Sequence, residues 1–246
     1  LAETHHARWR ARPPFAVSCD PEGFLRPVRP LAGTSSDSRA LPGCAIVAGV
    51  ERFAGVDVGG PRKGFDLAIL EGSTVVELLS GQDVDEAASA IAAAGALVVG
   101  IDSPCSCALP GEKSRPGERK LAGELCSIFY TPDEQTVRSG NPFYRWVVEG
   151  LALYAALARE APTAEAIEVF PSAAWTVWAG PREGRPKPAW SRRALKASGV
   201  SGLPGRTSQD ARDAVGAALV ARAHWHGGTS DYGGIMVPRP GAVALK

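Results

Sequence analysis

The stretch Phe53-Ala-Gly-Val-Asp57-Val-Gly-Gly60 is an apolar run of strand length that carries an aspartate just before a glycine-rich turn. Three later segments also place carboxylates within or beside apolar runs, namely Val98-Val-Gly-Ile-Asp102-Ser-Pro104, Ala166-Ile-Glu168-Val-Phe-Pro171 and Asp210-Ala-Arg-Asp213-Ala-Val215. A carboxylate is costly to bury alone, so its repetition in four such segments indicates a shared purpose. Hard divalent cations bind oxygen ligands, and carboxylates from separate strands and helices can together surround one ion. The sequence therefore predicts a metal site built from these segments.

Three short strands are predicted in and after the first segment, at residues Arg52–Val58, Phe65–Leu70 and Thr74–Leu79. Turn residues fill both short connections, so the three strands are expected to form an antiparallel meander. Asp83 and Glu86 then have the spacing of a capping box, which predicts a helix that runs to about Ala94.

The rest of the chain alternates strands with helices. Ala96–Ile101 is a continuous apolar run, as expected for a strand that is buried on both faces, and Glu165–Phe170 is the fifth predicted strand. Helices are predicted over Glu118–Leu125, Trp146–Arg159, Ser172–Ala179, Ser191–Ser198 and Ser208 to about Trp225, with a loop at Pro181–Pro188. The expected fold is an α/β mixed five-stranded sheet with helices on both faces. Its order, βββαβαβα, is similar to that of the ribonuclease H fold.

Composition limits the class of protein. Residues 1–50 are rich in proline and arginine and are expected to form a poorly ordered extension, which leaves residues 51–246 as one domain. The 27 basic and 26 acidic residues give a net charge of +1, which argues against general nucleic-acid binding by charge but allows a local basic groove. The 5 cysteines have no regular spacing and are interpreted as reduced thiols of a cytoplasmic protein. No apolar run reaches the roughly 18 residues of a membrane span.

Each carboxylate also has a purely structural alternative. Asp57 can cap the turn that follows it, Asp102 can form an Asx turn, and Glu168 can lie on a solvated strand face. Asp210 can complement the dipole of its helix, whereas Asp213 lies one turn further on and faces the expected core. Their joint occurrence favours ligands for two Mg²⁺ or Mn²⁺ ions.

The same residues resemble the family called domain of unknown function 429, a group of predicted ribonuclease H-like nucleases. The matching stretches are Gly55-Val-Asp57, Ile101-Asp102-Ser-Pro104, Arg115-Pro-Gly-Glu-Arg119-Lys120 with Ser127-Ile-Phe129, Ile167-Glu168-Val-Phe-Pro171 and Asp210-Ala-Arg-Asp213-Ala, within residues 53–240. The final helix is also similar to that of Holliday-junction resolvases. The resemblance implies the fold, a divalent-metal site and a suspected nuclease activity.

Basic residues near the carboxylates are candidate substrate contacts. Arg115, Arg119 and Lys120 follow Asp102 along the chain and are expected to reach a phosphate, although a solvated helix surface is the alternative. Lys187, with Arg192 and Arg193, is expected to line the other side of the site. Trp146, Trp175 and Trp178 are interpreted as core residues, and His224 and His226 as part of a helix end.

The expected function is a metal-dependent phosphodiesterase that acts on nucleic acid or a nucleotide-like substrate. In this hypothesis Asp57, Asp102, Glu168 and Asp213 are catalytic and hold the metal, with Asp210 as an additional ligand. A non-catalytic scaffold of the same fold, which binds nucleic acid or protein, is the alternative from another class. An actin-like sugar or acetate kinase also begins with a meander and an Asp-x-Gly turn, but it needs a second domain of that kind, and no second copy of the turn is found.

Overall fold

A seven-stranded mixed β-sheet organises the part of the chain that the structure, a computed structural model, describes, which is residues 50–242. The strands are β1 (Arg52–Asp57), β2 (Phe65–Glu71), β3 (Thr74–Gln82), β4 (Val98–Asp102), β5 (Glu165–Val169), β6 (Thr229–Asp231) and β7 (Ile235–Pro238). Their order across the sheet is β3-β2-β1-β4-β5-β7-β6. β1, β4, β5 and β7 run parallel, while β2, β3 and β6 pair antiparallel with their neighbours.

All five predicted strands form, with ends that differ from the prediction by at most three residues. The meander is present, and Gly72 has the left-handed backbone (φ 59°) that its tight turn requires. The predicted number of five strands was wrong, because β6 and β7 extend the sheet beyond β5. Both are only three or four residues long, and such short segments carry little periodicity.

The helices are α1 (Val84–Ala94), α2 (Pro116–Glu124), α3 (Glu134–Val137), α4 (Arg145–Glu160), α5 (Pro171–Ala179), α6 (Lys187–Ser198) and α7 (Gln209–Trp225), with a 3₁₀ turn, η1, at Pro142–Tyr144. The predicted capping box at Asp83 and Glu86 is present, and Gly95 closes the same helix in the left-handed region. α6 begins four residues before its predicted start, because Pro188 is accommodated in the first helical turn rather than in a loop. α3 and η1 were not predicted.

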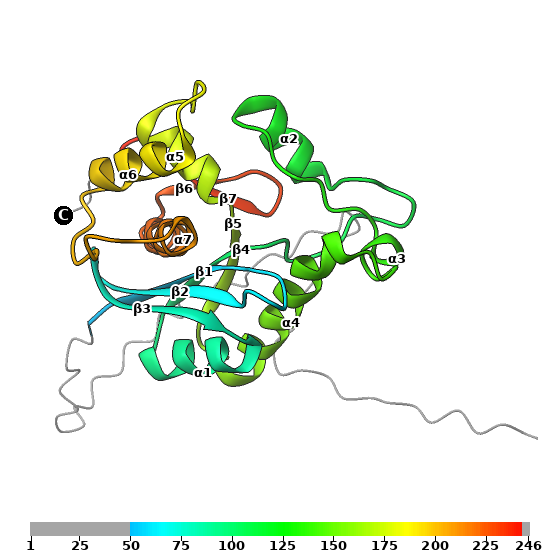
Figure 1. The fold of residues 1–246 in the computed structure, drawn as a ribbon, viewed down its shortest axis with the longest axis horizontal. Coiled ribbons are helices and arrows are strands. Elements are labelled where there is room, and N and C mark those ends of the chain that lie inside the picture. Colours follow the sequence, from blue (N-terminus) through cyan, green and yellow to red (C-terminus); the bar gives the residue numbers. More distant parts are fainter. Residues whose placement is uncertain (1–49, 243–246) are drawn as a thin grey trace, which may run out of the picture. The chain divides into compact units, whose positions relative to one another are not determined.

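Two apolar layers pack against the sheet. α5, α6 and α7 cover one face, where Phe53, Val98 and Trp175 are buried, and α1 and α4 cover the other, around Val56 and Ile101. Figure 1 shows α7 nearly end-on, close above β1 and β2, with α5 and α6 beyond it and α1 on the opposite side of these strands. Trp175 is fully buried, as predicted.

Helix α7 approaches the sheet unusually closely. A Cβ atom at Gly55 would lie 2.1 Å from the carbonyl oxygen of Ala214, and one at Gly100 would lie 2.3 Å from that of Ala217. The two glycines in the strands and the alanines of the helix therefore let the two backbones touch. This contact fixes the first turns of α7 over the ends of β1 and β4.

The structure does not describe residues 1–49 and 243–246, so the extension expected over residues 1–50 lies outside the described residues except for Val50. Among residues 50–242, none of the helices has both the length and the apolar character needed to cross a membrane.

Candidate metal centre

Three aspartates lie side by side on neighbouring strands. Asp57 ends β1 and pairs in register with Asp102, the last residue of β4, while its partner on β2 is Asp66. Side chains alternate along a strand, so Asp57 shares the face of Gly55, and Asp102 shares that of Gly100. Both carboxylates therefore lie on the face that α7 covers.

Helix α7 supplies two further carboxylates. Asp210, in its first turn, brings one oxygen into a group with Asp57 and Asp66, and the three oxygens lie within 4.8 Å of one another. The Nζ of Lys63, in the turn after β1, lies 2.9 Å from Asp210 Oδ2 and 3.4 Å from Asp57 Oδ2. The predicted convergence of the β1 acid with the last helix is therefore present.

Asp213 is held from several directions. Its side chain is 2% exposed. Oδ1 accepts hydrogen bonds from Trp175 Nε1 and Gln209 Nε2, both at 3.0 Å, and Oδ2 lies 2.9 Å from Lys187 Nζ. Because α5, α6 and α7 all contribute to these contacts, the orientation of this carboxylate is fixed before any ligand arrives.

The crowding of carboxylates changes their acidity. Burial, followed by the negative charge of Asp213, raises the pKa of Asp57 from 3.8 to about 7, although Lys63 opposes the shift. Burial also raises the pKa of Asp102 well above its ordinary value, and the charges of Asp57 and Asp213 add to this effect. The site thus carries more negative charge than its surroundings stabilise.

Two lysines compensate only part of that charge. Burial lowers the pKa of Lys187, but Asp213, Asp102 and Asp57 together outweigh burial and raise it. The same balance, with Asp57 and Asp210, raises the pKa of Lys63. The donor set of closely spaced carboxylate oxygens, with the pKa values of Asp57 and Asp102 raised, fits a hard divalent cation such as Mg²⁺ or Mn²⁺, because such an ion favours the charged form of every carboxylate.

Glu168 lies next to this group but is engaged elsewhere. Its Oε1 and Oε2 accept hydrogen bonds from Arg115 Nη2 and Nη1, at 2.5 and 2.7 Å, and the N–H of Cys105 also donates to Oε2. Glu168 and Arg115 are 5% and 7% exposed, so the pair is buried. Its charge contributes to the raised pKa of Asp102. A metal-ligand role for Glu168 stays a prediction, and it requires Arg115 to share the carboxylate.

Arg115 also binds Glu118, which makes the ion pair a triad. Arg115 Nε lies 3.0 Å from Glu118 Oε1, and Glu118 accepts the backbone N–H groups of Arg115 and Thr131. All three nitrogens of the guanidinium thus face carboxylates. In this arrangement Arg115 joins α2 to β5 and has no direction left for the phosphate contact expected from the sequence.

The other predicted basic contacts lie at different distances from the aspartates. Lys187 is at the site through Asp213. Arg119 is half-exposed and bonds Ser114, while Lys120 lies over the ring of Tyr232, with 5.0 Å between Nζ and the ring centroid. Neither of these two contacts an aspartate of the centre, so their substrate role stays a prediction.

Asp66 and Lys63 were missed by the sequence-based reasoning. Asp66 is the second residue of the apolar strand β2, which follows the turn after Asp57, so the register of an antiparallel pair would have placed it opposite Asp57. Lys63 lies within that turn, and only the left-handed Gly64 and the turn geometry bring its ammonium group back over the strand end.

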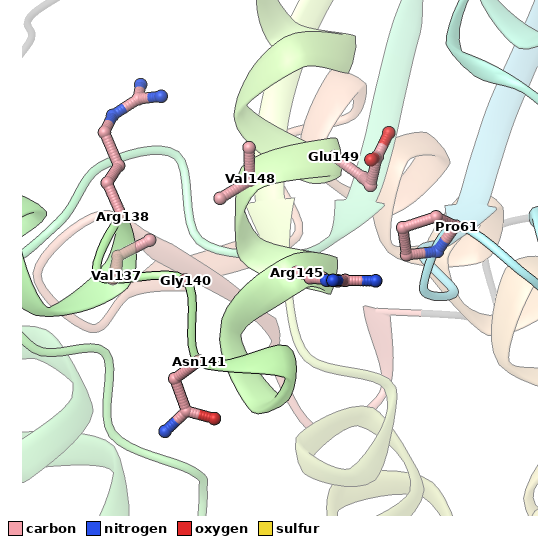
Figure 2. A pocket seen from close by; sticks show the side chains of 8 residues that line it. All are labelled: Pro61, Val137, Arg138, Gly140, Asn141, Arg145, Val148 and Glu149. Carbon is pink, nitrogen blue, oxygen red and sulfur yellow. The ribbon is translucent and has the colours of Figure 1, made fainter.

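A pocket of about 350 Å³ lies beside the turn that follows Asp57. Pro61 forms one wall, and Arg138, Arg145 and Glu149 belong to the α3–α4 region on the other side. In Figure 2 the side chains of Arg145 and Glu149 extend from α4 on the side of Pro61, whereas Arg138 extends away from them. No aspartate of the centre lines this pocket, which is connected to the centre only through the turn that contains Pro61 and Lys63.

Nucleophilic cysteine chemistry does not fit the site. Burial, followed by the charge of Glu168, raises the pKa of the Cys105 thiol to about 12, and burial raises the pKa values of Cys107 and Cys126. The thiolate form that would react is therefore suppressed at neutral pH among the described cysteines.

A family model described as "Protein of unknown function (DUF429)" matches residues 55–234, which include every aspartate of the centre. Neither the search of curated proteins nor that of solved structures gives a match. The matched segment runs from β1 to the turn before β7 and so covers well over half of the sequence. The match confirms the resemblance to the family called domain of unknown function 429, and the chain belongs to the DUF429 family.

Proposed function

We propose that this protein is a divalent-metal-dependent phosphodiesterase with a ribonuclease H-like fold, acting on nucleic acid or a nucleotide-like substrate. The observation that carries the proposal is the convergence of Asp57, Asp66, Asp102, Asp210 and Asp213 at one end of the parallel strands. The order β3-β2-β1-β4-β5 within the sheet supports the fold assignment. It makes β1 and β4 neighbours, so Asp57 and Asp102 lie side by side, as the ribonuclease H-like order predicted from the sequence requires.

Asp57 and Asp102 would hold Mg²⁺ or Mn²⁺ together with Asp213, and Asp66 and Asp210 lie close enough to Asp57 to contribute. When bound, such ions neutralise the charge of a phosphodiester and lower the pKa of an attacking water. Trp175 and Gln209 keep Asp213 in one orientation, so ion binding requires no rearrangement of that residue.

Lys63 and Lys187 have a second role in this proposal. Each now neutralises aspartate oxygens, at 2.9 Å from Asp210 and Asp213 respectively. Both ammonium groups are about half-exposed, so they are able to turn toward a phosphate once the carboxylates are compensated by metal. They would stabilise the negative charge of the phosphate and orient it toward the aspartates.

The test is thermal unfolding of the chelator-treated protein with and without added Mn²⁺ or Mg²⁺. We expect millimolar metal to raise the Tm of the wild type by several degrees, because an ion that binds only the folded state stabilises it. Asp57→Asn should remove most of this rise. Asp85→Asn, which changes an exposed aspartate in the first turn of α1, is the matched control and should respond like the wild type.

Hydrolysis is measured on the same proteins with labelled DNA and RNA, single-stranded and double-stranded. Metal-dependent cleavage that is lost in Asp57→Asn would support the proposal. A wild type whose Tm ignores metal, or whose cleavage survives in Asp57→Asn, would contradict it.

A non-catalytic scaffold that binds nucleic acid is the second candidate. It is favoured by the ion pairs of Lys63 and Lys187, which give the aspartates partial compensation without a metal. In that case metal would not change the Tm, and Lys63→Gln with Lys187→Gln would weaken nucleic-acid binding without any cleavage to lose.

A further inference from the structure

A cationic pocket lies between α6 and the beginning of α7. Its volume is about 770 Å³, and it is lined by α6, the connection from Val200 to Ser208, and α7. Four lining side chains are positively charged, namely Arg192, Lys196, Arg206 and Arg212, and no lining residue of the described chain is acidic. Leu195, Val200 and Leu203 give the same pocket an apolar part.

Arg212 is a buried cation with neutral partners. It is 5% exposed, and its guanidinium donates to Ser191 Oγ at 2.9 Å, to Gln209 Oε1 at 3.0 Å and to the carbonyl oxygen of Thr207. None of these acceptors carries a charge. The carboxylates of Asp213 and Asp210 act on this charge, but neither contacts the guanidinium directly. A buried charge is stabilised by a nearby charge of opposite sign, so the position of Arg212 at the pocket wall favours an anion in the pocket.

The exposed cations that line the pocket are also able to bind an anion. Arg192, Lys196 and Arg206 form no ion pair with any carboxylate in residues 50–242. Ser208, the N-cap of the 17-residue helix α7, lines the pocket as well, so the positive end of the helix dipole adds to the field. Every charged side chain that lines the pocket therefore has the sign that attracts an anion.

One side chain connects this pocket to the aspartates. Gln209 accepts from Arg212 Nη2 through its Oε1 and donates to Asp213 Oδ1 through its Nε2, each at 3.0 Å. Helix α6 makes the same connection, because it supplies Lys187 to Asp213 and Arg192 to the pocket. The anion site and the aspartate centre are thus separated by a single amide group.

We propose that this pocket binds one nucleotide unit of the nucleic-acid substrate, adjacent to the phosphodiester at the aspartates. The inference rests on the proposed function and adds a substrate subsite to it. Arg192 and Arg206 hold the phosphate, Arg212 adds its positive charge from the pocket wall, and the apolar wall contacts the attached sugar or base. The volume is in the range of small-molecule sites, so it accommodates a nucleotide rather than a phosphate alone.

The test is nucleic-acid binding by the full chain in the presence of chelator, which prevents metal-dependent turnover. Fluorescence anisotropy of labelled single-stranded and double-stranded oligonucleotides is measured for wild type, for Arg192→Gln/Arg206→Gln, and for the control Lys113→Gln/Arg159→Gln. The control removes two exposed charges that do not line the pocket, one of them on α4 across the sheet. All four substituted side chains are exposed, so both variants are expected to fold.

We expect the pocket variant to bind about tenfold more weakly than wild type at moderate salt, and its salt dependence (the slope of log K against log salt) to fall by about one to two. The control should bind within about twofold of wild type. Inorganic phosphate should raise the Tm of wild type and control more than that of the pocket variant. Equal binding by the two variants would overturn the inference, and so would a wild type that binds no oligonucleotide.

The failures are distinguishable. Pocket-dependent binding without metal-dependent cleavage would contradict the proposed function and leave the subsite in place. Metal-dependent cleavage with pocket-independent binding would contradict the subsite alone. Binding of inorganic phosphate at the pocket without any oligonucleotide binding would show an anion site whose occupant is not nucleic acid, and would overturn the inference.

Discussion

At the scale of single residues, the sequence identified some members of the aspartate centre, such as Asp57, but not others. Its place at the end of an apolar strand predicted a special role, and its partners Asp102 and Asp213 followed from the same pattern. Asp66 and Lys63 could not be identified with equal ease, because an isolated Asp or Lys beside a turn is common on protein surfaces. What makes them part of the centre is the pairing of β1 with β2, a relation in space.

The raised pKa of Asp57 predicts that ionisation of this carboxyl group lowers the stability of the folded protein as the pH rises. The protonated form is favoured in the folded state, so the contribution of Asp57 to stability is complete below its ordinary pKa of 3.8 and is lost as the pH rises through about 7. In metal-free protein, Asp57→Asn should therefore gain stability relative to wild type between pH 5 and pH 8, by roughly 2 kcal/mol.

Urea denaturation at these two pH values measures the gain. Asp85→Asn, on the exposed start of α1, should follow the wild type at both. If the stabilities of Asp57→Asn and wild type changed in parallel with pH, the carboxyl group of Asp57 would be ionised throughout the range and the crowding argument would fail.

The buried triad of Glu168, Arg115 and Glu118 makes a second prediction. Arg115→Met removes the cation that joins two buried carboxylates, Glu118 and Glu168, and it should lower the free energy of unfolding by about 3–5 kcal/mol. Arg119→Met, one turn later on α2, breaks a half-exposed pair with Glu112 at 3.7 Å and the hydrogen bonds to Ser114, and should cost only about 1 kcal/mol.

Chemical denaturation of the two variants compares these costs. Similar stabilities would mean that Glu168 does not depend on Arg115, and its expected role as a metal ligand would gain support.

At the scale of elements, the contact between α7 and the sheet depends on residues without bulk. A methyl group at Gly100 would meet the backbone oxygen of Ala217, which cannot turn aside as a flexible side chain does. Gly100→Ala should therefore destabilise the protein by about 1–3 kcal/mol and weaken metal binding, because α7 must move away and take Asp213 with it. Gly123→Ala, in open space on helix α2, should be neutral or slightly stabilising.

Thermal unfolding of both glycine variants measures the loss of stability, and a Mn²⁺ titration measures the loss of metal binding. If Gly100→Ala is destabilised but binds metal as tightly as wild type, the geometry of the centre does not depend on the close packing of α7, and this prediction is contradicted.

The elements themselves were largely predictable, and the physical reason is periodicity. β1 to β5 and the longer helices each carry an apolar pattern of sufficient length, and α1 also carries its capping box. β6 and β7 do not, since three or four residues cannot establish a pattern. The early start of α6 was hidden by Pro188, which fits a loop and a first helical turn equally well.

At the scale of the whole molecule, long-range pairs were the part that sequence patterns could not provide. Arg115 and Glu168 are 53 residues apart, and Lys187 reaches Asp213 from a different helix. Spacing along the chain predicted both arginine and lysine near the site but not which carboxylate each would bind. Such pairings are decided by how α2, α5 and α6 pack against the sheet.

The aspartates of the centre come from both ends of the described chain, since β1 begins at Arg52 and α7 ends at Trp225. During synthesis the strands with Asp57, Asp66 and Asp102 emerge long before the helix that brings Asp210 and Asp213 to them. A nascent chain that stops short of α7 has an uncovered sheet face and an incomplete set of carboxylates. Assembly of the centre is thus coupled to completion of the domain, so a ribosome-bound fragment cannot acquire the site early.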